Sequence, residues 1–130
     1  MVRLAQVAGK GRGLLASRAI PAGTCIELAP GVRLGAQDRE LVDRTGLFAY
    51  SFADPETFGR DGSGGHGCLF AFGQLTFCNH SAQPNAAVIW IEDDVGLWAR
   101  LEALQPIAEN EEITLFYTNI SEYSATDLFI

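Results

Sequence analysis

A polar turn between two apolar runs restricts the folds open to this chain more than any other feature. The turn is the eight-residue segment 78–85, Cys-Asn-His-Ser-Ala-Gln-Pro-Asn, and the apolar runs are 69–77 and 86–91. Asparagine supplies an amide donor and acceptor, histidine two distinct ring nitrogens and serine a hydroxyl, while proline fixes the backbone near the exit. Such a turn can hold a hydrogen-bonding ligand at a set angle. Taken alone, it would be interpreted as an ordinary connection between two strands.

The rest of the chain alternates between short strand-like runs and turns. The runs predicted as strands are 2–7, 14–20, 24–28, 48–52, 69–72, 86–91, 96–101 and 113–117. Residues 36–44 are rich in good helix formers and are followed by Gly46, which predicts one short helix. Short strands with frequent turns are typical of a mainly β fold. Residues 33–67 are interpreted as a helix-and-loop insert, and residues 118–130 as a C-terminal tail.

Two strand-to-strand turns echo each other. Residues 20–23 read Ile-Pro-Ala-Gly, and residues 107–110 read Ile-Ala-Glu-Asn. Asn110 therefore stands where Gly23 stands in the first turn. Because asparagine tolerates a left-handed backbone better than most residues with a side chain, both positions are predicted to adopt it.

Composition limits the classes of partner. The chain of 130 residues, 48% of them hydrophobic, is long enough for one core and is predicted to be a single domain, 1–130. Nine basic residues against 16 acidic ones give a net charge of −7, which argues against nucleic acid and is compatible with a basic peptide tail as substrate. No segment approaches the apolar length of a membrane span, so no membrane partner is expected.

The cysteines and histidines do not have metal-ligand spacing. Cys25, Cys68 and Cys78 are scattered, and no secretory segment is recognised at the start, which predicts reduced thiols and a cytoplasmic location. His66 lies in a glycine-rich loop and is expected to be solvated. No acidic or cysteine ligands lie at metal-like spacing near His66 or His80, so no metal site is predicted.

Three segments, in this order and at this spacing, resemble the SET-domain family of protein lysine methyltransferases. They are Lys-Gly-Arg-Gly-Leu at 10–14 with Ile-Pro-Ala-Gly-Thr at 20–24, Asn-His-Ser at 79–81 with Pro-Asn at 84–85, and Glu-Glu-Ile-Thr at 111–114 with Tyr117. The resemblance implies a SET-domain (β-clip-like) fold of small curved sheets. It also implies a pseudoknot-like C-terminal crossing, in which the closing segment passes beside the central turn.

The resemblance also implies an activity, which is methyl transfer from S-adenosylmethionine to a lysine side chain of a protein substrate. The implied cofactor-binding residues are Lys10, Gly11, Arg12, Gly13, Asn79, His80 and Tyr117. Tyr117 would orient the amine, and Tyr50 would be a second catalytic residue as a wall of the lysine channel. Tyr50 is equally well explained as a core strand residue.

The chain departs from many members of the family at three places. Many members carry arginine where Thr76 stands, cysteine where Ala82 stands and a zinc-binding segment after the tyrosine equivalent to Tyr117. The tail 118–130 or a partner is therefore expected to complete the cofactor pocket. The apolar residues 128–130 suggest a homodimer.

Two alternatives to the enzyme stay open at this point. One is a catalytically inactive SET-like module that binds a peptide or the cofactor. The other is a different small β domain that binds a sugar or another polar ligand, because openings like residues 20–26 are not unique to one family. Binding of the cofactor would distinguish the different β domain from the enzyme and the inactive module. A turnover assay would distinguish the inactive module from the enzyme. Leu115 stands where many members carry an aromatic residue, so the number of methyl groups added is left open.

Overall fold

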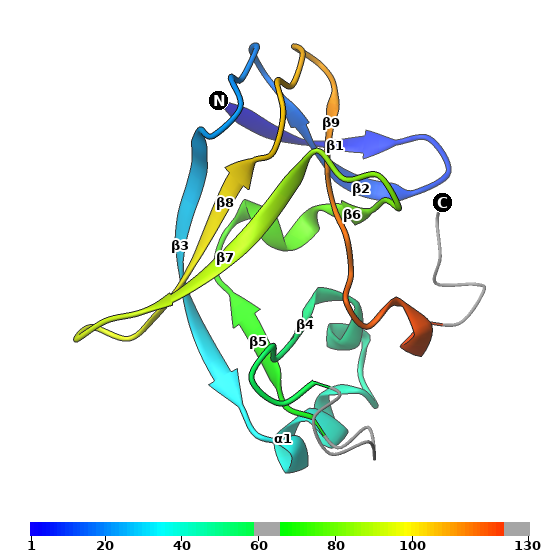
Figure 1. Ribbon diagram of the computed structural model, residues 1–130. Helices are drawn as coiled ribbons and strands as arrows, with labels where there is room; N and C mark the ends of the chain where they lie inside the picture. Colours follow the sequence, from blue (N-terminus) through cyan, green and yellow to red (C-terminus); the bar gives the residue numbers. More distant parts are fainter. Residues whose placement is uncertain (59–65, 124–130) are drawn as a thin grey trace.

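Nine strands form two curved sheets in the computed structural model, which describes residues 1–58 and 66–123 (Figure 1). One sheet has the order β1-β2-β9-β6, and the other has the order β4-β5-β3-β8-β7. The strands are β1 Val2–Val7, β2 Gly11–Ala16, β3 Cys25–Leu34, β4 Phe52–Ala53, β5 Cys68–Ala71, β6 Asn79–His80, β7 Ala86–Glu92, β8 Leu97–Ala103 and β9 Glu112–Leu115. The helical segments are α1 Ala36–Val42 and the 3-10 turns η1 Gly46–Tyr50, η2 Gln74–Phe77 and η3 Ile120–Glu122.

The core draws on both sheets. Along β8, every second side chain is buried, from Leu97 to Ala103, as expected for a strand with one face on a core. Leu14 of β2 and Ile113 of β9 are fully buried in the same cluster as Leu101 of β8. Burying one such side chain contributes about 1.5–3 kcal/mol. The two sheets are therefore held together by a shared apolar interior.

The five-stranded sheet curls so strongly that its two edges meet. β4 and β7 are the outermost strands of this sheet. Even so, Phe52 of β4 and Trp90 of β7 pack edge to face, with ring centroids 5.4 Å apart. The mainly β architecture of small curved sheets with one α-helix in the described residues confirms the predicted fold class.

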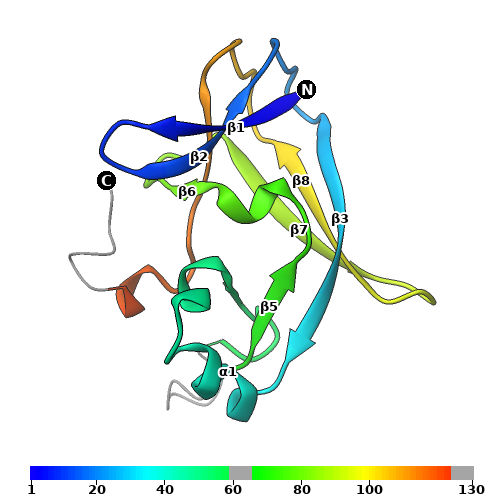
Figure 2. The same ribbon diagram turned by 180° about the vertical axis from the view of Figure 1, so that it is seen from behind.

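The closing segment runs along the central turn. β6 pairs in parallel with β9, and the Ser81 N–H donates a hydrogen bond of 2.8 Å to the Leu115 carbonyl. Between β6 and β9, the chain forms the β7–β8 hairpin. Seen from behind, η2 and β6 lie beside the β1–β2 hairpin (Figure 2). The chain thus brings β9 back across the turn from which β7 departs, which is the crossing that the resemblance implies.

The echo between the two short turns is confirmed. Gly23 has φ +81° and Asn110 has φ +69°, so both adopt the left-handed backbone. Ile20 and Ile107 form an isolated bridge between the two turns, and both side chains are buried. The turns therefore lie side by side and bury their apolar residues in the common core.

The strand predicted over 48–52 is wrong in its first part. The Thr45 hydroxyl caps η1 by accepting the Leu47 N–H at 3.1 Å, and only Phe52 belongs to a strand. The alternating aromatic residues are explained by separate partners: Phe48 packs on Tyr123, Tyr50 on Phe77 and Phe52 on Trp90. A 3-10 turn points the rings of Phe48 and Tyr50 toward different neighbours, which one flat strand face would not do.

β3 is longer than the predicted strand 24–28, because it continues past Pro30. The Pro30 carbonyl accepts a hydrogen bond from the Phe72 N–H, just beyond the end of β5. Pairing between β3 and β5 begins only at Gly31 and Ala71. Proline therefore lies where its missing N–H removes no bond of the ladder, which is the kind of position that strands tolerate.

Candidate active site

His80 and Tyr117 are joined by the pairing of β6 with β9. The Tyr117 N–H donates to His80 Nδ1 at 2.9 Å, so Nδ1 is unprotonated and the ring proton of neutral His80 lies on Nε2. The side chain of His80 is buried, and this burial, with the charge of Lys10, lowers its pKa. His80 is therefore a neutral ring at physiological pH, with an N–H donor at Nε2.

The Tyr117 hydroxyl is also held in place. It donates a hydrogen bond of 2.5 Å to the Cys78 carbonyl, and its ring packs against His80 at 5.3 Å and against Tyr123 at 5.4 Å between centroids. Burial raises the pKa of Tyr117, with smaller contributions from neighbouring groups that include Tyr123 and Cys78. The hydroxyl thus keeps its proton and directs it to the backbone. Its oxygen lone pairs can accept from a ligand, whereas a role as general base is disfavoured.

Glu112 joins the glycine-rich opening to the central turn. Its carboxylate accepts from Lys10 Nζ at 2.9 Å and from Asn79 Nδ2 at 2.8 Å. Asn79 Nδ2 also lies 3.4 Å from the Arg12 carbonyl. A Cβ atom on Gly13 would lie 2.8 Å from Asn79 Nδ2, so a side chain at this position would displace the Asn79 amide. Residues 10–13 of the opening therefore lie next to Asn79 of the central turn.

Tyr50 and Arg12 share a different aromatic partner. The Arg12 guanidinium lies over the Phe77 ring, 4.2 Å from its centroid, and Tyr50 packs on Phe77 at 5.4 Å. The structure thus places Tyr50 with Phe77 and Arg12, and it places Tyr117 with His80. The catalytic role predicted for Tyr50 stays a prediction.

Asn85 fastens the end of the turn to β9. Its side chain is 5% exposed, its Oδ1 accepts the Thr114 N–H at 2.9 Å, and its Nδ2 donates to the Glu112 carbonyl at 2.8 Å and to the Glu111 carboxylate at 3.1 Å. Sequence reasoning included Asn85 in the motif and assigned it no role. Glu112 is likewise part of a motif to which the sequence assigned no individual role. The signal was present, because both residues belong to segments that carry the resemblance.

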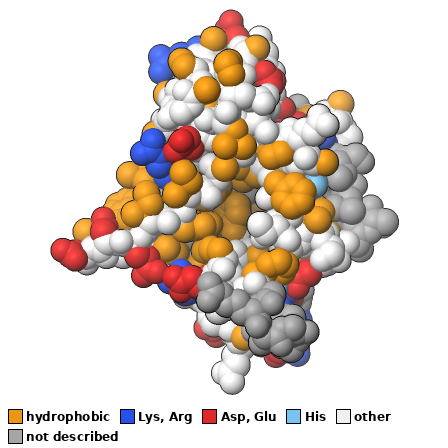
Figure 3. Space-filling model, viewed as in Figure 1, with side chains coloured by type: hydrophobic (Ala, Val, Ile, Leu, Met, Phe, Trp, Pro, Cys, Tyr) orange, Lys and Arg blue, Asp and Glu red, His pale blue; other side chains and the backbone are white. Residues whose placement is uncertain are grey.

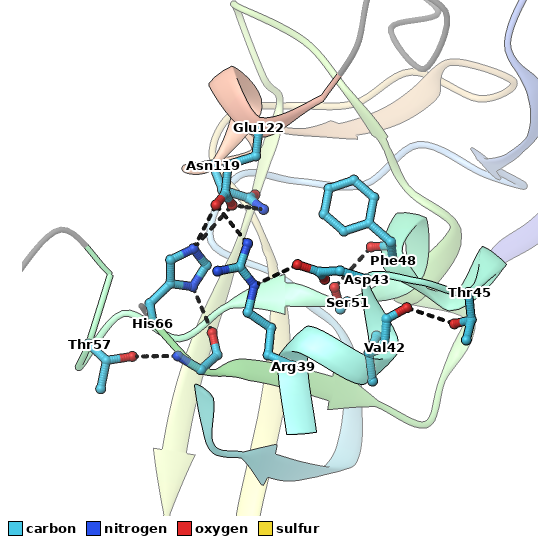
Figure 4. A network of polar contacts seen from close by, with 11 residues as sticks. Arg39, Val42, Asp43, Thr45, Phe48, Ser51, Thr57, His66, Asn119 and Glu122 are labelled. Carbon is cyan, nitrogen blue, oxygen red and sulfur yellow. Dashed lines mark hydrogen bonds and ion pairs between the residues drawn. The ribbon is translucent and has the colours of Figure 1, made fainter. Parts of the chain in front are cut away.

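The first turn of the tail is tied to the insert by a polar network (Figure 4). The Glu122 carboxylate accepts from Arg39 at 2.7 Å, from His66 at 3.0 Å and from Asn119 at 3.0 Å. Arg39 also pairs with Asp43 at 3.0 Å. Burial opposes ionisation of Glu122, but the hydrogen bonds from these neighbours outweigh it and lower its pKa.

His66 was expected to be a solvated loop residue, and this prediction is wrong. The side chain is 2% exposed, its Nδ1 lies 2.8 Å from the Gly67 carbonyl, and Phe58 packs against its ring. Its glycine-rich surroundings in the sequence suggested exposure, whereas the partner that buries it, Glu122, lies 56 residues further along. Glu122 and His66 are thus elements of the site's support that sequence reasoning missed.

The network holds an aromatic cover over Tyr117. Tyr123, which directly follows η3, packs between Tyr117 and Phe48, with centroid distances of 5.4 and 4.8 Å. The described part of the tail, 118–123, therefore lies on the insert and on Tyr117. Residues 128–130, on which the homodimer was predicted, lie outside the described residues.

Replacing Glu122 with glutamine is expected to lower the free energy of unfolding by about 1–3 kcal/mol, since charge-assisted hydrogen bonds to Arg39 and His66 are lost. Glu56→Gln is the matched control. Its carboxylate is 63% exposed and lies 3.5 Å from Arg33, so a change within about 0.5 kcal/mol is expected. Urea unfolding followed by tryptophan fluorescence measures both, and equal effects would contradict the structural role of Glu122.

An apolar cavity of about 380 Å³ adjoins Tyr117. Its walls come from β4, from β7 and from the segment after β9. The lining residues are Ser51, Phe52, Ala53, Pro55, Pro84, Ala86, Ala87, Val88, Trp90, Leu104, Leu115, Phe116, Tyr117, Thr118 and Asn119. Figure 3, which views the molecule from the same side as Figure 1, shows a hollow lined by hydrophobic side chains in the middle of that face. Tyr117 thus packs on His80 and also lines the cavity.

Other features of the described residues bear on the chemistry. Within residues 1–58 and 66–123, no cluster of three or more His, Cys, Asp or Glu side chains could hold a metal ion. In the same ranges, no helix has both the length and the apolar character needed to cross a membrane. Cys25, Cys68 and Cys78 are free thiols.

Comparisons with known proteins identify the family of the chain. The SET domain family matches residues 11–118. A histone-lysine N-methyltransferase of Schizosaccharomyces pombe, named as specific for lysine 37 of histone H3, is 32% identical over 109 residues, which are 83% of this chain and 67% of that protein. The match contains both the glycine-rich opening from Gly11 and the closing Tyr117.

Two solved structures share the fold. The Neurospora SET domain protein DIM-5, a histone lysine methyltransferase, superimposes with a TM-score of 0.68 at 20% identity and covers 95% of this chain, which spans 54% of that protein. A candidate histone methyltransferase from Plasmodium falciparum superimposes with a TM-score of 0.67 at 20% identity, covering 91% of this chain and 97% of its own. From the match over residues 11–118 and the yeast relative, the chain belongs to the SET-domain family of protein lysine methyltransferases.

Proposed function

We propose that the chain transfers a methyl group from S-adenosylmethionine to a lysine side chain of a protein substrate. The observation that carries the proposal is Tyr117, whose hydroxyl is oriented by the Cys78 carbonyl, whose ring packs on His80 and which also lines the apolar cavity. A cofactor on one side and a lysine on the other would meet at this hydroxyl. The inactive module named above has no evident need for so constrained a tyrosine.

The residues beside His80 fit the proposed cofactor. S-adenosylmethionine supplies an electrophilic methyl group on a sulfonium cation, which requires surroundings without a free positive charge. His80 is held neutral, and the Glu112 carboxylate pairs with the Lys10 ammonium. Gly11 has φ +78° and open space where a Cβ would stand, so a ligand can approach the backbone closely. Asn79, His80 and the backbone of residues 10–13 would hold the cofactor.

The cavity side fits a lysine that must lose its proton. A free lysine has a pKa of about 10.4, so its amine is almost entirely protonated at neutral pH. Apolar surroundings such as Ala86, Leu115 and Phe116 disfavour the charged form and lower that pKa without a dedicated base. Because the Tyr117 proton is directed to Cys78, the hydroxyl oxygen can accept an N–H of the amine and leave the nitrogen lone pair free.

A basic tail of a histone or a similar protein is proposed as the substrate. The net charge of −7 favours association with a cationic peptide. The Schizosaccharomyces pombe relative is named for a histone lysine, which supports the same class.

The proposal is tested by incubating the full chain and isotopically labelled S-adenosylmethionine with histone-tail peptides, followed by mass spectrometry. We expect a label on lysine. Binding of S-adenosylhomocysteine without any transfer would instead favour the inactive module, and the absence of binding would reject both. His80→Ala should weaken binding of S-adenosylhomocysteine at least tenfold in calorimetry, whereas Gln83→Ala, exposed in the same turn, should not.

Acid is expected to destabilise the chain through His80. Burial lowers the pKa of His80 below the ordinary value of 6.5, so the unfolded chain binds this proton more readily than the folded one. The stabilisation is complete above about pH 6.5 and is lost as the pH falls through the folded pKa. Protonated Nδ1 can no longer accept the Tyr117 N–H. Urea midpoints between pH 5 and 7.5 should therefore fall with acid in the wild type and less in His80→Gln, and identical slopes would refute the assignment.

A further inference from the structure

The cavity beside Tyr117 is larger than a single methylated lysine requires. Its wall follows β7 from Ala86 to Trp90, and a strand rises about 3.3 Å per residue, so the wall extends about 13 Å. This length matches about four residues of an extended peptide. A substrate that places its lysine at Tyr117 therefore meets additional apolar surface along β7.

The part of the wall farthest from the central turn is aromatic and aliphatic. Phe52 and Trp90 lie at 5.4 Å from each other at the meeting point of the two sheet edges, and Val88 lies two residues before Trp90 on the same face of β7. Burying an apolar side chain on such a surface is favourable, whereas a buried charge without a partner is strongly disfavoured. This surface therefore favours a substrate with an apolar side chain over one with a charged side chain at the same position.

Three acidic residues are neighbours in sequence of residues that line this end of the cavity: Asp54 and Glu56 lie on either side of Pro55, and Glu92 lies two residues after Trp90. Arg33 pairs with Asp54 at 2.9 Å, with Glu56 at 3.5 Å and with Glu92 at 2.5 Å. Three carboxylates share one guanidinium, which leaves an excess of two negative charges beside the cavity-lining residues Ala53 and Pro55. These carboxylates favour a bound peptide that has basic residues next to its apolar side chain, and they repel an acidic peptide.

We propose that the Phe52–Val88–Trp90 end of the cavity is a specificity subsite for an apolar side chain of a basic peptide, located two residues from the methylated lysine. The inference rests on the proposed function for the position of the lysine. In an extended peptide, residues i and i+2 point to the same face, whereas i+1 points away. The lysine and the apolar residue would therefore enter the cavity side by side, and the flanking basic residues would lie near the carboxylates.

The test uses basic peptides with one lysine, in which leucine or serine is placed at each of the positions −2, −1, +1 and +2. Both kcat/KM for methyl transfer and the calorimetric affinity are measured with the full chain. We expect leucine to be preferred over serine about tenfold or more at one of the positions two residues away, and less at the adjacent positions. Aspartate at the preferred position should be the worst substrate.

A pair of variants on β7 assigns the preference to the cavity. Val88→Thr keeps the shape of a lining side chain and makes it polar, so the leucine preference should fall several-fold. Ile89→Thr changes the next residue, which is 44% exposed and does not line the cavity, and the preference should persist.

The outcomes separate the two proposals. Methyl transfer with no leucine preference at any position, or with a preference that Val88→Thr leaves intact, would overturn the subsite and leave the enzyme standing. Tighter binding of the leucine peptide without any methyl transfer, lost in Val88→Thr, would support the subsite and reject the proposed activity. Equal binding of leucine, serine and aspartate peptides would reject the subsite whether or not transfer occurs.

Discussion

Replacing Asn85 with alanine is expected to lower the free energy of unfolding by about 2–5 kcal/mol, one of the two largest effects that the structure predicts. The variant deletes both the acceptor of the Thr114 N–H and the donor to the Glu112 carbonyl. Asn85 is 5% exposed, so water does not readily replace these bonds. Each buried backbone group left without a partner costs about 1–3 kcal/mol.

Urea unfolding of the wild type and of Asn85→Ala measures this effect. Gln83→Ala is the control, because Gln83 is exposed in the same turn and a change within about 0.5 kcal/mol is expected there. Cofactor affinity should fall with Asn85→Ala as well, since β9 carries Glu112, the partner of Asn79. An unfolding midpoint equal to that of Gln83→Ala would show that Asn85 does not fasten the turn to β9.

Replacing Tyr117 with phenylalanine is expected to reduce the rate of methyl transfer at least tenfold, which corresponds to about 1.4 kcal/mol or more in the transition state. The ring contacts with His80 and Tyr123 are retained, because only the hydroxyl is removed. What disappears is an oxygen that the Cys78 carbonyl holds in one orientation. In the proposed mechanism that oxygen aligns the amine, and among the described residues no other hydroxyl is held at this position by the Cys78 carbonyl.

Single-turnover kinetics at saturating cofactor measure the effect of Tyr117→Phe on transfer alone. Affinity for S-adenosylhomocysteine should change little, because the N–H that donates to His80 belongs to the backbone of residue 117. Tyr123→Phe is a matched comparison, because it keeps the ring that packs on Tyr117 and removes the other hydroxyl of this aromatic pair, and a smaller loss of rate than in Tyr117→Phe is expected. A wild-type rate in folded Tyr117→Phe would remove the hydroxyl from the mechanism.

The two expected effects have a common structural origin. Asn85 secures β9 to the central turn, and the next residues after β9 place Tyr117 against His80. The backbone of residues 114–117 is therefore held by Asn85 at Thr114 and by His80 at Tyr117. This support positions the ring that carries the hydroxyl. A site of this kind depends on support from the fold as much as on the residues that touch a ligand.

The sequence by itself determined the features that depend on short segments. The left-handed backbone at Gly23 and Asn110 follows from residue type, because few side chains tolerate that conformation. The strand predicted over 96–101 agrees with β8, Leu97–Ala103, within a residue or two. The motifs of residues 10–14, 20–24, 79–85 and 111–117 indicated the fold class, and the structure brings Lys10 close to Asn79 and His80 close to Tyr117.

Only the tertiary structure decided the features whose partners lie far apart in the chain. Local pattern made 48–52 a strand and His66 a solvated residue. Phe48 instead belongs to a 3-10 turn and packs on Tyr123, which lies 75 residues later in the chain. The ring of His66 is buried and bonded to Glu122, 56 residues later. The orientation of the Tyr117 hydroxyl likewise depends on a backbone carbonyl, at Cys78, that carries no signal of residue type. Side-chain identity constrains nearby backbone strongly, but the burial and hydrogen bonding of a residue depend on groups that only the folded chain brings into contact.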